Sequence, residues 1–308
     1  MAISRKVFIR REDLPLWALG ALVLLSAIGF GAYYYYDRYV HPNEKVLDRQ
    51  ARHLEEMVQK NPQNADLRVA AANYYLDGGL VDLAIQQGEE ALKINADHQG
   101  ALVLLGRAYQ KKGDAETAIA YFTRVVALNK DNPMAKIDTR FEMVNYQLGV
   151  LYSQQGKYPE AVQALQRALS IDRTDADARY ALGIVYQKQG DHASAIREFQ
   201  EALRFVPDFT DAYQALVTSY SALGKTQEAA YARAMVVLTQ GKYYDAAGQL
   251  EAVIAQAPDL TPAYLGLGLA YEKLGKRDQA LAAAQRFLKA QPSDIAAQQL
   301  LGRLREGE

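Results

Sequence analysis

Three residue types recur along this chain with a period of 34 residues. Tyr152, Tyr186 and Tyr220 are spaced at that interval, and an alanine series and a glycine series repeat it. The glycines keep this spacing except for one step of 43 and one of 17: Gly79, Gly113, Gly156, Gly190, Gly224, Gly241 and Gly275. A period of this length indicates one supersecondary unit that stacks on copies of itself. We therefore expect the 308 residues to extend along one axis instead of dividing into separate globular domains.

Each repeated unit has the pattern of two amphipathic helices joined by a turn. In the clearest copy, residues 175–207, a first helix ends at Gly190 and a second ends before Pro207. Small residues such as Gly183 stand where the two helices must touch, and larger ones such as Phe199 fill the gaps beside them. One such pair cannot bury its own apolar faces, so it needs neighbours of the same shape.

This 34-residue helix–turn–helix pattern resembles the tetratricopeptide-repeat family over residues 65–294. The resemblance implies an all-α solenoid of antiparallel helix pairs, and it implies a binding surface more than a chemistry. We expect full repeats at 65–98, 99–132, 142–175, 176–209 and 261–294, an irregular stretch at 210–260, and a C-terminal capping helix at 295–308.

Two stretches depart from the regular repeat. Nine extra residues, Pro133 to Phe141, are either a loop or an early start to the next helix. The second stretch, Thr226–Gln240, matches both the second helix of the preceding pair and the first helix of the next. An odd helix interrupts the two-helix alternation, so we expect a change of curvature between Gly224 and Tyr244, unless helix pairing there is unbroken.

The amino-terminal region has a different character from the repeats. Residues 1–13 form a short basic tail, and residues 14–36 hold no charged residue over 23 positions. A helix of that length spans roughly 35 Å, enough to cross a hydrocarbon core of about 30 Å. We expect one N-terminal transmembrane helix at 14–36 in contact with the lipid bilayer, with a cleaved signal peptide as the alternative. Residues 37–64 follow as a linker and an N-terminal capping helix.

The orientation of this segment follows from its flanking charges. Within ten residues, the amino side carries four Lys or Arg and the carboxyl side two, although the counts become even over twenty residues. Cytoplasmic flanks are enriched in Lys and Arg. We expect a single-pass membrane protein with a cytoplasmic N-terminus and an extracytoplasmic solenoid, and keep the reverse orientation as the alternative.

The composition and the motifs give no sign of catalysis. Net charge is −1, from 35 Lys and Arg against 36 Asp and Glu, so no basic excess attracts nucleic acid. The chain has no cysteine, and its four histidines are not spaced as a helical metal pair. No nucleophile-elbow or phosphate-loop motif occurs. We therefore expect that this protein is not an enzyme, that it has no catalytic, cofactor or metal site, and that it has no small-molecule substrate.

The family resemblance implies that the first helices line a concave groove for a protein or peptide partner. Carried onto this chain, the groove positions are Asn73, Asp77, Arg107, Gln110, Lys111, Tyr146, Ser153, Gln154, Tyr180, Gln187, Lys188, Glu272 and Lys273. Tyrosine offers a large contact area at low entropic cost. We expect removal of Tyr146 and Tyr180 to weaken partner binding and to leave thermal melting nearly unchanged.

A carboxylate clamp found in some members of this family is largely missing. Asn73 matches one of its elements, but Val69, Leu104, Met143 and Gln147 stand where four others belong. We therefore do not expect this chain to bind the chaperone tails that the clamp holds.

These observations combine into one functional hypothesis. The chain is expected to be a membrane-anchored scaffold that binds a protein partner in its groove, for assembly or docking of a cell-envelope complex. The alternative is the same scaffold facing the cytoplasm and recruiting soluble factors to the membrane.

Overall fold

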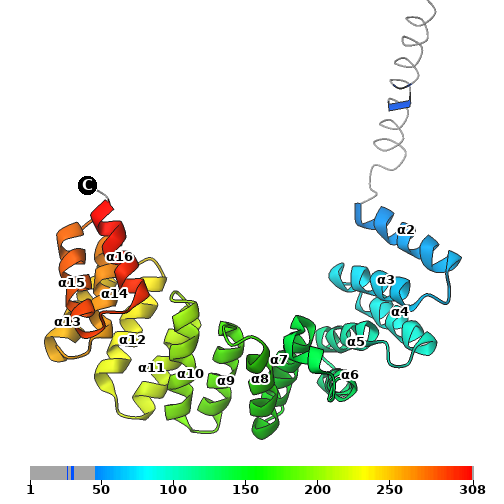
Figure 1. The fold of residues 1–308 in the computed structure, drawn as a ribbon, viewed down its shortest axis with the longest axis horizontal. Coiled ribbons are helices and arrows are strands. Elements are labelled where there is room, and N and C mark those ends of the chain that lie inside the picture. Colours follow the sequence, from blue (N-terminus) through cyan, green and yellow to red (C-terminus); the bar gives the residue numbers. More distant parts are fainter. Residues whose placement is uncertain (1–25, 27–28, 31–45, 307–308) are drawn as a thin grey trace, which may run out of the picture. The chain divides into compact units, whose positions relative to one another are not determined.

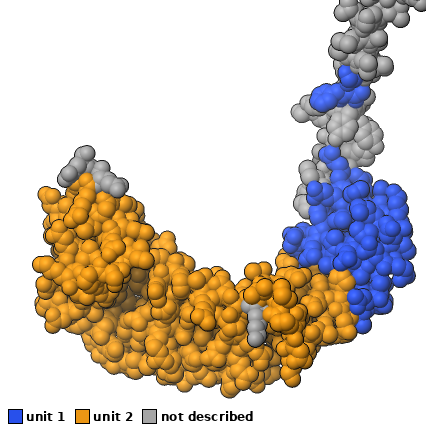
Figure 2. All heavy atoms as spheres, viewed as in Figure 1, with its two compact units in different colours: residues 1–96 blue, residues 97–308 orange. Residues whose placement is uncertain are grey.

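The computed structural model describes residues 26, 29–30 and 46–306, and all regular structure in that part is helical (Figure 1). The chain divides into two compact units, residues 1–96 and 97–308, coloured separately in Figure 2.

Residues 46–96 of unit 1 form three helices, α2 (Val46–Lys60), α3 (Ala65–Asp77) and α4 (Val81–Ile94). Helix α3 packs against both α2 and α4. The hydroxyl of Tyr75 on α3 donates a hydrogen bond to the Glu55 carboxylate on α2. In unit 2, Tyr271 makes the same bond to Glu251 of the preceding second helix, again twenty residues earlier. Helix α2 thus packs against α3 in the same way as the second helix of one repeat packs against the first helix of the following repeat.

Unit 2 is a stack in which each α-helix packs against the next. Its elements are α5 (Gln99–Lys112), α6 (Ala115–Leu128), the 3-10 helix η2 (Pro133–Ile137), α7 (Thr139–Gln154), α8 (Tyr158–Ile171), α9 (Ala176–Lys188), α10 (His192–Phe205), α11 (Thr210–Ala222), α12 (Thr226–Thr239), α13 (Tyr243–Gln256), α14 (Pro262–Lys273), α15 (Arg277–Ala290) and α16 (Ile295–Glu306). The nine extra residues therefore form both a short 3-10 helix and an early start of α7.

The described turns within the pairs contain a left-handed glycine, and in two of them, before α6 and α10, a capping aspartate follows it. Gly190 has φ +81°, a conformation that glycine adopts without the steric cost of a Cβ. Asp191 follows it and accepts a hydrogen bond from the Ser194 amide at 3.0 Å, which caps α10. This glycine-to-cap step lets one helix end and the next begin within a few residues.

The two helices of a pair approach closely at a glycine. A Cβ added to Gly106 would lie 2.4 Å from the ring of Phe122, and one added to Gly183 would lie 2.5 Å from Phe199. Both phenylalanines are fully buried. Gly149 meets Leu165 in the same way, at 2.4 Å. The glycine and its large partner are sixteen residues apart in each case, so one contact recurs in three pairs.

Helix α12 belongs to two pairs at once. It packs against α11 as a second helix does, and it also packs against α13. Ala234 on α12 and Leu250 on α13, again sixteen residues apart, are both fully buried, which is the spacing of a first and second helix. Helix α12 is therefore the second helix of a pair with α11 and also the first helix of a pair with α13, so both interpretations of residues 226–240 describe part of its packing.

This double role divides the first helices into two rows. Helix α9 contacts both α7 and α11, whereas α14 contacts both α12 and α16. We call α5, α7, α9 and α11 the first row, and α12, α14 and α16 the second row. At α12 each helix still packs against the next, and this unbroken packing counts against the expected change of curvature. What changes at α12 is which helices contact the helix two places along: odd-numbered helices contact each other before α12, and even-numbered helices do so from α12 on.

The predicted transmembrane helix at 14–36 and the basic tail at 1–13 lie outside the described residues, apart from Ser26, Gly29 and Phe30, which are helical. Within the described ranges, no helix has both the length and the apolar character needed to span a bilayer.

The close glycine contact gives a stability prediction. Gly106→Ala should lower the free energy of unfolding by about 1–3 kcal/mol, because the new methyl group meets the buried Phe122 ring. Gly248→Ala is the matched control, since it is a helical glycine with nothing within 4 Å of an added Cβ. That change should raise stability by up to about 1 kcal/mol. Urea unfolding followed by circular dichroism distinguishes the two, and equal effects would contradict the close contact.

Candidate functional site

Polar side chains connect neighbouring helices of the first row. Gln110 Nε2 on α5 donates a hydrogen bond to Gln147 Oε1 on α7 at 2.8 Å. Lys188 Nζ on α9 donates to Ser153 Oγ on α7 at 3.4 Å. The predicted groove residues Gln110, Ser153 and Lys188 thus lie where one first helix faces the next.

Gln187 continues the same series toward α11. Its Nε2 donates to the Ala215 carbonyl at 3.0 Å and to Ser219 Oγ at 2.8 Å. Gln187 and Gln110 each stand eleven residues after the start of their expected repeats, so the same position makes the same kind of contact twice. We call the side chains of Gln110, Gln147, Ser153, Lys188, Gln187 and Ser219 the polar row.

Three further predicted residues are exposed on the helices that carry the polar row. Arg107 and Lys111 lie four residues apart on α5, so they share one helical face. Gln154 is exposed at the end of α7, next in sequence to Ser153 of the polar row. The α5 end of the row is therefore basic.

Two predicted groove residues belong to unit 1. Asn73 lies on α3 and its Nδ2 donates to the Val69 carbonyl at 3.1 Å. Asp77 is exposed at the end of the same helix. Both residues therefore lie in unit 1, whereas the polar row lies in unit 2.

Glu272 and Lys273 lie on α14, in the second row. The Glu272 carboxylate accepts hydrogen bonds from Arg303 Nε at 2.7 Å and Nη2 at 3.0 Å, which connects α14 to α16. Lys273 is exposed. The contact resembles those of the polar row, but it belongs to the row that starts at α12. The predicted residues of unit 2 therefore lie on two different rows of helices, and the packing does not place them all in one groove.

The two central tyrosines also pack against apolar side chains. The ring centroid of Tyr180 lies 5.0 Å from that of Phe209 and 5.7 Å from that of buried Phe199. Tyr146 packs against the cluster that contains Leu182 and is half-buried. Removing these rings would open space between repeats, and large-to-small changes at such positions cost stability. The expectation that their removal leaves melting nearly unchanged therefore disagrees with this packing.

A carboxyl group with an unusual pKa stands beside Tyr146. Burial, together with the nearby carboxylates of Asp175 and Asp172, raises the pKa of Glu142 to about 7. Asp175 is held in place as the N-cap of α9, where its Oδ1 accepts from the amides of Asp177 and Ala178 at 2.9 and 3.1 Å. The charge at this point of the first row therefore changes across neutral pH.

Sequence reasoning missed the partners of the polar row. Gln147 was noted only as a departure from the carboxylate clamp, and Ser219 and Arg303 were not considered. The repeat period held a usable signal, because a polar residue at the end of one first helix faces the middle of the next. Reading each groove position against the following repeat would have found these pairs.

The arrangement as a whole offers hydrogen bonds and charge to a ligand. Across the described ranges, no three His, Asp or Glu side chains form a group able to hold a metal ion.

Comparison with protein families returns one kind of repeat. A TPR repeat model matches residues 149–190, and tetratricopeptide-repeat models match residues 100–132, 176–209 and 237–304. No curated protein matches the chain in sequence.

Solved structures with similar folds include that of MamA protein, which is 26% identical with a TM-score of 0.53, over 58% of this chain and 92% of that one. YrrB, described as a TPR protein with an unusual peptide-binding site, is 19% identical with a TM-score of 0.51, over 69% and 96%. The C-terminal part of a TPR repeat-containing protein from Cytophaga hutchinsonii is 17% identical with a TM-score of 0.53, over 87% of this chain and 98% of that one. At these identities the last two show the fold alone.

The raised pKa of Glu142 gives a pH prediction. The folded state prefers the protonated carboxyl, so stability from this group is present below the ordinary value of 4.5 and is lost as pH rises through about 7. Glu142→Gln cannot ionise, so its melting temperature should match wild type near pH 4.5 and exceed it at pH 8. Glu160 is exposed, so Glu160→Gln is the control, and its melting temperature should differ from that of wild type by the same amount at both pH values. A Glu142→Gln effect of equal size at both pH values would contradict the assignment.

Proposed function

The chain is a tetratricopeptide-repeat protein, and from that premise we propose that it is a non-catalytic scaffold that binds an extended segment of a partner protein along its first row. The observation that carries the proposal is the polar row, whose hydrogen bonds join the four successive first helices α5, α7, α9 and α11. Polar side chains that recur from one repeat to the next suit a ligand with a repeating structure, such as an extended polypeptide backbone.

The amides of the polar row have hydrogen-bonding capacity left for a ligand. Gln110 uses Nε2 and Gln147 uses Oε1 in their mutual contact, which leaves Gln110 Oε1 and Gln147 Nε2 unpaired among the described residues. An amide side chain carries both donor and acceptor atoms. One free acceptor beside one free donor is the complement of a peptide group, so this pair suits main-chain recognition.

The basic end of the row favours an acidic partner segment. Arg107 and Lys111 are exposed on one face of α5, beside Gln110. Arginine at an interface binds carboxylates with two parallel hydrogen bonds. YrrB supports the proposal only as a similar fold described with a peptide-binding site.

We further propose that residues 14–36 anchor the scaffold in a membrane, with the solenoid outside the cytoplasm and serving assembly or docking of a cell-envelope complex. The support is the run of 23 uncharged positions and the excess of Lys and Arg before it. The alternative orientation would direct the same groove to soluble cytoplasmic factors.

The groove proposal predicts a cross-link that depends on charge. A photoreactive amino acid in place of exposed Gln154, in the full chain in its own cells, should yield one discrete protein adduct. Combined Arg107→Glu and Lys111→Glu should reduce that adduct about tenfold or more, because charge reversal at an interface repels the partner. The control Lys225→Glu with Lys242→Glu makes the same charge change at exposed turn and cap positions and should have no effect. An adduct that survives the Arg107 and Lys111 changes would contradict the proposal.

The topology proposal predicts when a single cysteine reacts. The chain has no native cysteine, and Gln189 is exposed at the C-cap of α9, so Gln189→Cys is a clean reporter. In intact cells, a maleimide that cannot cross the inner membrane should label it before lysis. Labelling only after lysis would favour the cytoplasmic orientation instead.

A further inference from the structure

The nine-residue insertion builds a cavity of about 420 Å³ beside the second helices. The ends of α6 and α8, the helix η2 and the start of α7 surround it, with Val126, Phe141 and Ile171 among its apolar walls. Second helices form two of its sides, so it is separate from the polar row on the first helices. No part of the proposed groove function uses it.

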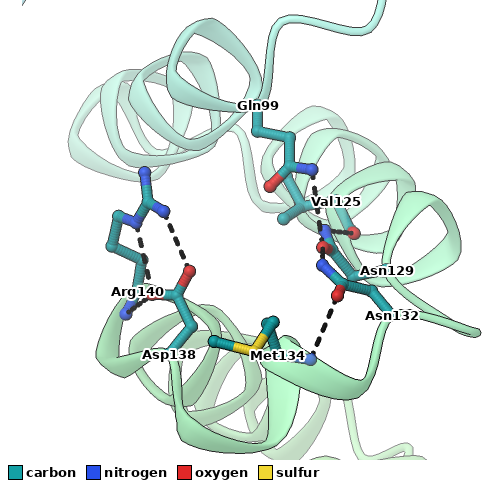
Figure 3. A network of polar contacts seen from close by, with 7 residues as sticks. All are labelled: Gln99, Val125, Asn129, Asn132, Met134, Asp138 and Arg140. Atoms are coloured by element: carbon teal, nitrogen blue, oxygen red, sulfur yellow. Dashed lines mark hydrogen bonds and ion pairs between the residues drawn. The ribbon is translucent and has the colours of Figure 1, made fainter.

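A hydrogen-bond network holds one wall of the cavity in place (Figure 3). Asn129 is only 6% exposed, and its Nδ2 donates to the Val125 carbonyl at 2.9 Å. Its Oδ1 accepts from Asn132 Nδ2 at 3.1 Å and from Gln99 Nε2 at 3.4 Å. Asn132 Oδ1 in turn accepts from the Met134 amide at 3.0 Å, which fixes the start of η2. Because the buried Asn129 amide is held by all of these hydrogen bonds, the cavity wall is organised before any ligand arrives.

The other end of the insertion is fixed as well. Asp138 caps α7, accepting from the Arg140 amide at 2.9 Å, and its carboxylate pairs with the Arg140 guanidinium at 2.9 Å (Figure 3). This pairing holds the pKa of Asp138 below its usual range. Both ends of the insertion are thus anchored, and η2 stands between them.

The polar lining of the cavity is cationic. Lys130 and Arg167 both line it and are both exposed, and neither has an ion-pair partner among the described residues. Among the described residues that line the cavity there is no Asp or Glu. Two unpaired cations with no acidic lining group make the site complementary to carboxylates.

The insertion also exposes apolar side chains next to the cavity. Met134 and Ile137 on η2 are 62% and 70% exposed, although both are large and apolar. Grouped exposed apolar side chains on a folded protein mark interaction sites. A ligand for this region must therefore offer apolar surface as well as negative charge.

We propose that this cavity binds an acidic peptide segment of a partner protein, with one apolar side chain inside it and Asp or Glu carboxylates facing Lys130 and Arg167. The chain then holds two separate protein-binding surfaces, the polar row and the insertion cavity.

The test uses a labelled heptapeptide, SEDLEES, and the full chain in mild detergent, with fluorescence anisotropy as the measurement. Replacing the leucine of the probe by serine, or its acidic residues by their amides, should weaken binding about tenfold or more. Combined Lys130→Glu and Arg167→Glu should weaken binding of SEDLEES to a similar extent. The control Lys225→Glu with Lys242→Glu should change it less than about twofold, as for surface charges remote from an interface.

Two outcomes would overturn the proposal: no binding of SEDLEES at about 1 mM, or equal binding of the three peptides. Combined Arg107→Glu and Lys111→Glu keeps the outcome distinct from that of the groove proposal, since it should leave SEDLEES binding unchanged. If it abolishes binding instead, the peptide occupies the polar row and the cavity assignment is wrong.

A variant that fills the cavity separates its apolar part from its charge. Ala127 lines the cavity and is exposed, so Ala127→Trp should fold, which its circular dichroism melt can verify. The variant keeps both cations and should lose the preference for leucine over serine in the probe. An unchanged preference would show that the leucine binds elsewhere and would overturn the proposal.

Discussion

The contact between a glycine on the first helix of a pair and a large side chain on the second sets the geometry on which the rest of unit 2 depends. Gly183 against Phe199 shows it clearly, because there is no room for even a methyl group between them. Close packing fixes the distance between the helices and buries one face of each. The opposite face of the first helix is then free to carry polar side chains at a constant spacing. The hydrogen bonds of the polar row depend on this constraint, since they join neighbouring first helices that the close packing holds in place.

The repeat period predicted the helical class and the solenoid well, because small and large residues at one spacing leave few other ways to bury a helix face. It predicted the surroundings of individual side chains less well. Tyr180 was assigned to an open groove, yet its ring contacts Phe209, which lies in the loop before the next repeat. Periodicity describes each helix within its own pair, whereas such contacts depend on how the following pair is placed. The insertion cavity was beyond reach for the same reason, since it combines residues of α6, α7 and α8.

Both proposed binding surfaces arise where the chain uses residues that packing within one repeat does not need. The polar row lies where neighbouring first helices face each other, with Ser153 and Ser219 buried, and the insertion cavity occupies the space beside η2. Each offers cations and hydrogen-bonding amides, so both suit segments that carry carboxylates. A scaffold with two such surfaces can hold one partner at two points or two partners at once, and binding at both points raises the local concentration of the second segment.

Helix α12 has a consequence for the electrostatic polarity of the stack. Consecutive helices joined by short turns run antiparallel, so the helices of the first row share one direction and those of the second row, beginning with α12, share the opposite direction. Each helix carries about half a positive charge at its N-terminus and half a negative charge at its C-terminus. The positive ends of the first row therefore lie along one edge of unit 2, and those of the second row along the other. The shared helix thus reverses the direction of the helix dipole between the first row and the second row.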